Sequence, residues 1–209
     1  MPKLRASARD RFQRCCDEMI RAILLCAGAS SRFGSPKLLA KRSDGIALVT
    51  RSAHSLMEGA GNVLAVIRPG DRALQYALVT AGCDVIESAA AARGMGASLA
   101  SGVAGSPDAS GWIVALGDMP DILPATHRAV VDALAKGAKL AAAVSRSTRE
   151  RGHPVGFSRA FLDELRALDG DEGARSVVTR HRDALVEVLV EDPGIFLDID
   201  TPADLAKPR

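Results

Sequence analysis

The chain has 209 residues with a formal net charge of +2, and 47% of its residues are hydrophobic while only 3% are aromatic. This length and composition suit one globular domain with a core of aliphatic side chains. A net charge so close to zero favours neither nucleic acid nor a membrane as a partner. No apolar run approaches the roughly 20 residues that span a bilayer, and no signal peptide is recognisable, so we expect a cytoplasmic protein.

Residues 1–18 differ from the rest of the chain, because they carry several arginines and little apolar periodicity. We interpret them as a basic N-terminal extension that is either disordered or not native, with Met19 as the start of the domain. From there, strand-like and helix-like segments alternate. The predicted strands cover residues 19–27, 62–67, 84–86, 111–116, 140–144, 154–157, 185–190 and 195–198. The predicted helices cover residues 47–59, 72–81, 95–103, 124–136, 159–168, 172–180 and 202–206. This alternation predicts a single Rossmann-like α/β domain of three layers with a mostly parallel, mixed sheet.

A glycine-containing loop follows the first predicted strand, within residues 23–37 (ILLCAGASSRFGSPK). Gly28 and Gly34 allow the backbone to approach a ligand closely, and exposed N–H groups in such a turn bind phosphate oxygens. Arg32 offers a planar fork and Lys37 a compact charge to the same anion. Because ligands of α/β sheets bind beyond the carboxyl ends of the strands, this loop is the expected phosphate site.

Two common phosphate-binding motifs do not fit this loop. A dinucleotide-binding fingerprint requires G-x-G-x-x-G, which Ala29 and Ser30 interrupt. A P-loop requires a lysine directly after its second glycine, but Lys37 stands further on. The missing fingerprint argues against a nicotinamide-dependent oxidoreductase. A nucleotide-binding protein without catalytic activity stays open as an alternative.

Acidic residues follow two later predicted strands. Asp118, in Gly117-Asp118-Met119-Pro120, comes directly after the strand at 111–116. Its carboxylate is either a ligand of Mg²⁺ or a cap of the next turn. Asp198 and Asp200 follow the last predicted strand, whose alternation would place both on one face, and an N-cap is the alternative role.

Three motifs together resemble the MobA-like nucleotidyltransferases, most closely the molybdenum cofactor cytidylyltransferases. They are L-x-x-G-x-S-x-R-x-G-x-x-K in the first loop, G-D-M-P in the middle of the chain, and D-I-D-T-P-x-D-L near its end. The resemblance implies a nucleotidyltransferase domain of the nucleotide-diphospho-sugar transferase type over residues 19–209. It implies Mg²⁺ on Asp118 and Asp200, and catalytic roles for Lys37, Arg32 and Asp118. The nucleotide-binding residues that it implies are Leu25, Cys26, Ala27, Gly28, Ser30, Arg32, Gly34, Lys37 and Ser98.

Two further segments, G-H-P-V at 152–155 and G-D-E-G-A-R at 170–175, resemble the acceptor side of these enzymes. The resemblance implies His153 and Arg175 as acceptor-binding residues, whereas the residues alone fit a turn and a helix-surface cation equally well. One departure lies in the segment around Ser98, where the family pattern G-M-S-x-S-L has a serine and this chain has Gly96.

The resemblance also implies the reaction, in which an acceptor phosphate attacks the α-phosphorus of a nucleoside triphosphate and pyrophosphate leaves. Relatives that use CTP carry A-A-G in the first loop and those that use GTP carry A-G-G, so Cys26-Ala27-Gly28 favours CTP by its second position. We therefore expect CMP transfer to a molybdopterin-type molybdenum cofactor, with a molybdoenzyme or its maturation factor as a further partner. GTP as the donor, and a sugar phosphate or another phosphorylated acceptor, stay open.

Overall fold

The structure is a computed structural model that describes residues 19–28, 33 and 36–205. The predicted N-terminal extension and three predicted site residues, Ser30, Arg32 and Gly34, lie outside the described residues. Among the described helices, none combines the length and the apolar character needed to cross a bilayer.

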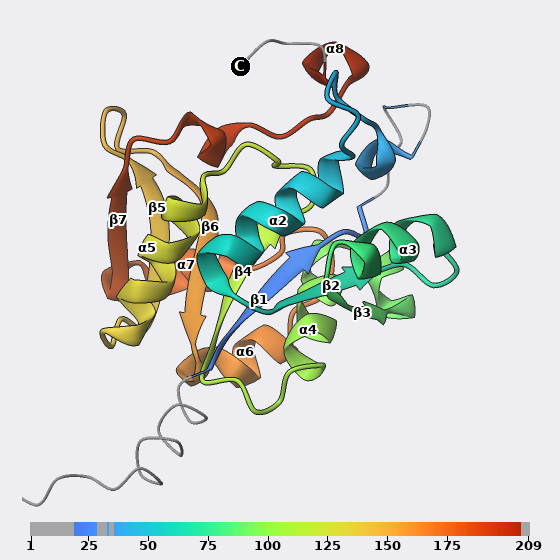
Figure 1. Cartoon of the computed structure of the whole chain (residues 1–209). Coiled ribbons are helices and arrows are strands. Elements are labelled where there is room, and N and C mark those ends of the chain that lie inside the picture. The colour runs from blue at the N-terminus through green and yellow to red at the C-terminus, as the bar shows by residue number, and fades with distance from the viewer. Residues whose placement is uncertain (1–18, 29–32, 34–35, 206–209) are drawn as a thin grey trace, which may run out of the picture.

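The described strands form one sheet in the order β3-β2-β1-β4-β6-β5-β7 (Figure 1). They are β1 (Ile20–Leu25), β2 (Val63–Ile67), β3 (Asp84–Glu87), β4 (Gly111–Leu116), β5 (Leu140–Ser145), β6 (Arg151–Ser158) and β7 (Leu185–Val190). Only β6 runs against its neighbours β4 and β5, and the other neighbouring pairs are parallel. The predicted mostly parallel, mixed sheet is therefore confirmed.

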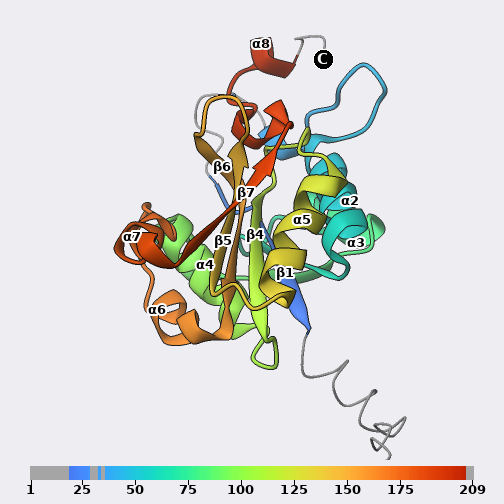
Figure 2. The same cartoon turned by 90° about the vertical axis from the view of Figure 1, so that its left-hand side faces the viewer.

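Helices cover both faces of this sheet and make it the middle of three layers (Figures 1 and 2). The α-helices are α2 (Leu48–Ala60), α3 (Arg72–Thr80), α4 (Met95–Ala104), α5 (Pro124–Ala135), α6 (Leu162–Arg166), α7 (Arg175–Arg180) and α8 (Pro202–Leu205). The 3₁₀ helices are η1 (Lys37–Leu39), η2 (Ala89–Arg93), η3 (Arg159–Phe161), η4 (Arg182–Ala184) and η5 (Pro193–Phe196). Helices α2, α3 and α5 cover one face, and α4, α6 and α7 cover the other (Figure 2).

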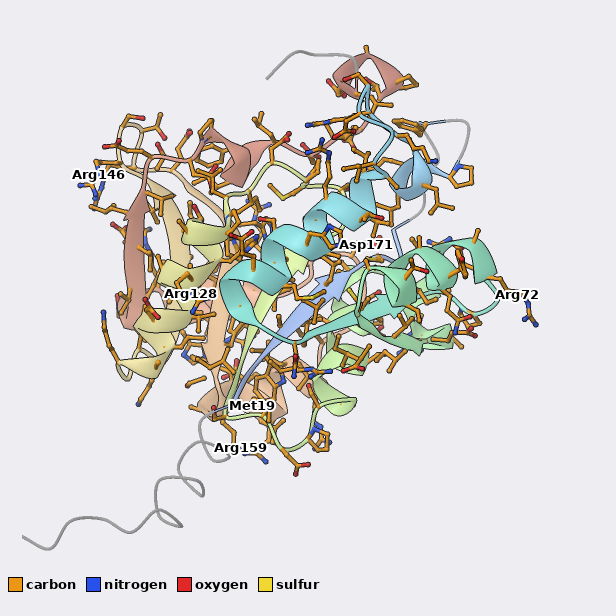
Figure 3. All side chains as sticks on the ribbon, viewed as in Figure 1. Met19, Arg72, Arg128, Arg146, Arg159 and Asp171 are labelled. Carbon is orange, nitrogen blue, oxygen red and sulfur yellow. The ribbon has the colours of Figure 1, made fainter. Side chains whose placement is uncertain are left out.

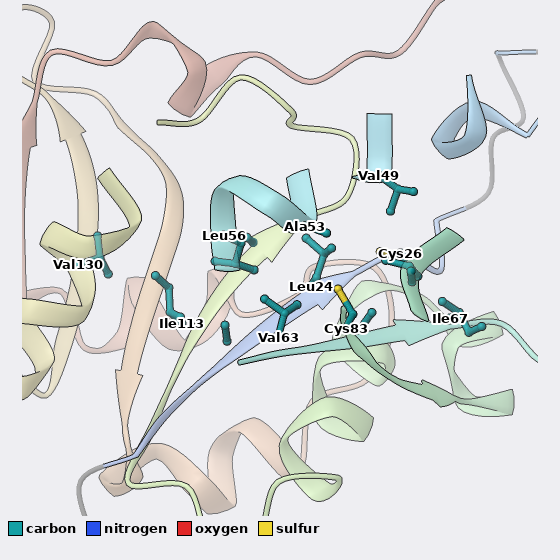
Figure 4. Close-up of a cluster of buried hydrophobic side chains, with 14 of the residues drawn as sticks. Leu24, Cys26, Val49, Ala53, Leu56, Val63, Ile67, Cys83, Ile113 and Val130 are labelled. Atoms are coloured by element: carbon teal, nitrogen blue, oxygen red, sulfur yellow. The ribbon is translucent and has the colours of Figure 1, made fainter. Parts of the chain in front are cut away.

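Strand β1 is buried on both faces, which explains its unbroken apolar sequence. Ala22, Leu24 and Cys26 pack in the cluster that contains side chains of α2, α3 and α5, part of which is drawn in Figure 4. Ile23 and Leu25 pack in the second cluster, with side chains of α4, α6 and α7. The alternation of side chains along one strand thus joins both outer layers to the sheet.

The predicted strand at 195–198 is wrong. Residues of this stretch form the end of η5, and no regular structure follows until α8. The carboxylate of Asp192 accepts a hydrogen bond from the Gly194 N–H at 2.9 Å and begins this 3₁₀ turn, which Pro193 also favours because it has no N–H for a strand ladder. The argument that strand alternation places Asp198 and Asp200 on one face therefore fails.

Three other predicted elements are divided or differ by more than two residues at one end. The predicted strand at 154–157 is the longer β6, because it pairs with both β4 and β5. The predicted helix at 159–168 is divided into η3 and α6. The helix predicted to begin at 172 begins at Arg175, after Gly173 with a φ of +57°, a backbone conformation that interrupts a right-handed helix.

Candidate functional site

The site lies where β1, β2 and β4 end at one edge of the sheet. Strand β1 pairs in parallel with β2 on one side and with β4 on the other, so the chain reverses its direction of travel across the sheet beside β1. Ligands of α/β sheets bind at such a switch point, beyond the carboxyl ends of the strands. The residues that follow the three strands here include Gly28, Arg68 and Asp118.

The turn after β4 is held against the end of β1 by close backbone contacts. The N–H of Gly117 donates to the Leu25 carbonyl oxygen at 2.9 Å, and the Ser52 hydroxyl of α2 donates to the Gly117 carbonyl oxygen at 2.9 Å. A Cβ atom on residue 117 would lie 2.9 Å from the Cys26 Sγ atom. Glycine therefore allows the turn to approach β1, and this approach positions Asp118.

Lys37, Asp118 and Asp200 meet in this turn region. The Lys37 Nζ atom lies 2.8 Å from Asp118 Oδ2 and 2.8 Å from Asp200 Oδ1. Burial alone would lower the pKa of the Lys37 ammonium, but hydrogen bonds and charges of the two carboxylates outweigh burial, and its pKa is raised above the ordinary value. The lysine therefore stays charged across the physiological pH range.

Asp200 reaches Lys37 through tertiary contacts of an irregular segment. The N–H of Ile199 donates to the Asp118 carbonyl oxygen at 3.0 Å, and the Ile199 side chain is fully buried with Phe33 and Leu48. Burial, followed by the negative charge of Asp200, raises the pKa of the neighbouring Asp198.

The beginning of the same segment is anchored to α5. The buried carboxylate of Asp192 accepts hydrogen bonds from the Leu123 N–H at 2.9 Å and from the Thr126 hydroxyl at 2.6 Å. A Cβ atom on residue 194 would lie 2.2 Å from the Asp121 carbonyl oxygen, so the segment can pass here only as Gly194. These contacts fix a stretch of chain that has no ladder hydrogen bonds of its own.

A cavity of about 490 Å³ contains the three charged side chains. Its walls include all the predicted nucleotide-binding and metal-binding residues that the structure describes, namely Leu25, Cys26, Ala27, Gly28, Lys37, Ser98, Asp118 and Asp200. Burial, followed by the charges of Cys83 and Asp118, raises the pKa of the Cys26 thiol well above its ordinary value, so the thiol stays neutral. The Ser98 hydroxyl donates to the Gly94 carbonyl oxygen at 3.0 Å, which leaves its oxygen lone pairs for a ligand.

A second cavity, of about 730 Å³, adjoins the first and shares the side chains of Leu25, Met95, Leu116 and Asp171 with it. Asp171, which is labelled in Figure 3, is exposed and lines both cavities together with Leu25 of β1. The second cavity contains the two predicted acceptor-binding residues, His153 and Arg175. The two groups of predicted residues are therefore brought to adjoining cavities.

The inner walls of the second cavity are apolar, with Leu99, Val155 and Phe157 among them. Burial is the main cause that lowers the pKa of His153, so its imidazole is neutral at physiological pH. Its Nδ1 atom is buried and has no hydrogen-bond partner within the described part of the chain. Arg151, Arg175 and Arg180 also line this cavity, so its walls suit a ligand that combines an apolar ring with an anionic group.

Sequence reasoning missed Arg68 in the first cavity and Arg151 in the second. Arg68 follows β2 directly, so the rule that indicated Asp118 after β4 would also have indicated Arg68. Burial, followed by the charges of Arg175 and Arg182, lowers the pKa of Arg151. The contribution of Arg151 to the cavity depends on β6, whose antiparallel path was not visible in the sequence.

The sheet order and the charged edge define an α/β fold of the nucleotidyltransferase type. A nucleotidyl transferase from Methanothermobacter has the same fold, with a TM-score of 0.73 at 20% identity over 89% of this chain and 94% of that chain. The chain belongs to the family described as the MobA-like NTP transferase domain, whose model matches residues 22–185. It is a nucleotidyltransferase, as the family description states.

Two relatives are similar over nearly the whole chain. The purine catabolism protein PucB from Bacillus subtilis is 30% identical in an alignment of length 202 that covers 87% of this chain and 92% of PucB. The crystal structure of Rv0371c from Mycobacterium tuberculosis is 30% identical, with a TM-score of 0.77 over 90% of this chain and 95% of that chain. Rv0371c has also been solved in complex with manganese, and that structure has a TM-score of 0.72 at 27% identity over 89% of this chain and 95% of that chain.

Proposed function

We propose that this nucleotidyltransferase transfers CMP from CTP to the phosphate of a molybdopterin-type molybdenum cofactor and releases pyrophosphate. The observation that carries the proposal is the sharing of Lys37 by Asp118 and Asp200, at 2.8 Å each, in a cavity that adjoins a larger one. The smaller cavity would hold the nucleotide and the larger one the acceptor, so that the two substrates meet at their shared wall.

The donor set of the first cavity fits a magnesium ion. Asp118 and Asp200 both contact the Lys37 ammonium, so their carboxylates lie close enough to share a cation. Mg²⁺ in proteins is typically held by one or two carboxylates together with substrate phosphates. The manganese complex of the relative Rv0371c supports a divalent ion in this family. When bound, such an ion would neutralise charge on the reacting phosphate oxygens.

The reaction needs positioning and charge neutralisation more than proton transfer. An oxygen of the acceptor phosphate forms a bond to the α-phosphorus, and the bond from the α-phosphorus to the oxygen bridging to the β-phosphorus breaks with its electron pair on pyrophosphate. The attacking oxygen is already anionic near neutral pH, so no general base is required. Lys37, which stays charged, would stabilise the negative charge on the α-phosphate and on the leaving group, with Arg32 in the same role.

The choice of CTP and of the acceptor is supported less directly. The loop Cys26-Ala27-Gly28 resembles the form found with CTP, and the apolar wall of the larger cavity suits a fused ring such as a pterin. Arg175 and His153 would then contact the acceptor. The name of PucB sets that relative in purine catabolism, so a molybdoenzyme of purine catabolism is the recipient that we propose.

Pyrophosphate release from the purified protein tests the proposal. The protein would be incubated with each of the four nucleoside triphosphates, Mg²⁺ and molybdopterin-bound molybdenum, with Asp118→Asn as the inactive control. Release with CTP above the other nucleotides supports the proposal. Release with GTP alone would support nucleotidyl transfer but contradict the assignment of CTP as the donor. No release from folded protein with a competent acceptor would leave the acceptor assignment without support.

A further inference from the structure

Arg68 lies at the end of β2 and is held beside the first loop. Its Nε atom donates to the Ala27 carbonyl oxygen at 2.7 Å, and its side chain lines the nucleotide cavity. The peptide between Ala27 and Gly28 is planar, so this hydrogen bond also fixes the direction of the Gly28 N–H. Arg68 therefore helps to shape the segment whose residues favoured CTP in the sequence.

The remaining donors of the guanidinium are available to a ligand. Within the described ranges, the two Nη atoms of Arg68 have no protein hydrogen-bond or ion-pair partner, and the residue is exposed. Because Nε already donates to Ala27, the N–H groups of the two Nη atoms are the ones that can bind two adjacent acceptor atoms lying in the guanidinium plane. No other described arginine lines this cavity.

Arg68 is placed for the base of the nucleotide and not for the reacting phosphate. Strand β1 lies between β2, which leads to Arg68, and β4, which leads to Asp118. Two strand spacings separate the backbones at the ends of β2 and β4 by on the order of 10 Å, and the Arg68 guanidinium is held beside Ala27 of the first loop, on the side away from β4. The cavity wall next to Arg68 includes the small side chains of Ala91 and Ala92, which leave room for a flat ring.

We propose, on the basis of the function proposed above, that Arg68 determines base specificity by reading two adjacent acceptor atoms on the base. Cytosine presents O2 and N3 as such a pair, and guanine presents O6 and N7. Uracil carries a hydrogen on N3, and adenine carries an amino group beside N7, so each offers the fork a donor that repels it. Arg68 therefore selects CTP against UTP and ATP, while the first loop separates CTP from GTP.

The test compares nucleotide preference in Arg68→Gln, Arg68→Lys and Arg72→Gln. Arg72 is a matched control, because it is exposed on α3 and Figure 3 shows it pointing away from the molecule. For each variant, kcat and KM are measured with all four nucleotides and one acceptor, and folding is checked by thermal unfolding. Binding of the four nucleotides is measured in parallel by calorimetry, which needs no acceptor.

Arg68→Gln is expected to lower the preference for CTP over UTP by roughly 10-fold or more, mainly through KM, as a lost bidentate contact to a base would. Arg68→Lys should behave in the same way, because it keeps the charge and loses the fork. An equal loss for all four nucleotides, or rescue by Arg68→Lys, would overturn the inference in favour of a structural or phosphate-binding role. If the wild type binds CTP but transfers nothing, the proposed function fails while the calorimetric preference still decides the role of Arg68.

Discussion

The two adjoining cavities are built in different ways. In the first cavity, three charged side chains come from the connections that follow strands: Lys37 begins η1 after β1, Arg68 follows β2 and Asp118 follows β4. In the acceptor cavity, most of the walls are apolar and come from the middle of elements, such as Val155 in β6 and Val178 in α7. The first cavity is thus centred on a cluster of charges, whereas the second combines an apolar wall with Arg151, Arg175 and Arg180.

Under the proposed function, this difference separates the residues that act on the nucleotide from those that select the acceptor. A charge at a strand end acts on any nucleotide that reaches it, so the charged cavity can serve a whole family. An apolar wall selects a ligand by the shape of the ring system that fits against it. Substitutions in β6 or α7 change that shape and therefore the ligand that is preferred. Substitutions in the first cavity should therefore affect turnover, and those in the second should affect the affinity for the acceptor.

The largest expected effect is that of Lys37→Ala. Loss of the charge between Asp118 and Asp200 should lower kcat by roughly 10²- to 10³-fold, as for other single electrostatic donors. Lys136→Ala, at the exposed end of α5, is the matched control. Steady-state pyrophosphate release measures both variants, and near-normal turnover in Lys37→Ala would contradict the role of the charged cavity.

The contacts of Asp192 hold the irregular segment that carries Asp200, and their environment can be probed through pH. His127 of α5 is buried and lies close enough to Asp192 to be affected by its charge. Burial lowers the pKa of His127 to about 4, while Asp192 opposes the shift. Between pH 6.5 and 4 the unfolded chain binds a proton at His127 that the folded chain does not, so the free energy of unfolding falls as the pH falls. The expected loss from pH 7 to pH 4.5 is roughly 2 to 3 kcal/mol.

His127→Gln should remove most of this loss, as measured by urea unfolding at the two pH values. His153 also has a lowered pKa, so a pH dependence in the same direction should persist in the variant. An equal loss of stability in wild type and variant would show that other groups determine the acid sensitivity.

In the acceptor cavity, Arg175→Ala should raise the KM for the acceptor by about 10-fold and leave the KM for the nucleotide unchanged, as loss of one exposed charged contact would. Arg166→Ala is the control, because Arg166 ends the nearby α6, is also exposed and does not line either cavity. Equal changes in both KM values would contradict the division of the site into two cavities.

The smallest effect is a change in stability, expected where the turn after β4 contacts the end of β1. Gly117→Ala would bring a Cβ atom to 2.9 Å from the Cys26 Sγ atom and should cost about 1 kcal/mol of stability. Cys26→Ala removes that sulfur and should relieve part of the cost. A double-mutant cycle of the two substitutions by chemical unfolding gives the coupling, and additivity would mean that the sulfur is not what makes glycine necessary.

Much of the fold and of the charged cavity could be predicted from the sequence, because the signals are local. The apolar run of β1 marks a central strand, and an acid directly after an apolar strand, such as Asp118, must lie at the edge of the sheet. Asp200 lies beside Lys37, and it was preferred to Asp198 through the family resemblance. The predicted strand, whose alternation would have placed both acids on one face, does not exist.

By itself, then, the sequence determined the alternation of elements and which side chains lie at strand ends, since periodicity and glycine placement act over a few residues. Tertiary structure decided the rest. Asp200 reaches the site only because Asp192 and Ile199 anchor an irregular segment, and the acceptor cavity exists only because β6 runs antiparallel between β4 and β5. Contacts between residues far apart in the chain leave no periodic trace, so the packing of the whole domain had to be known before these features could be seen.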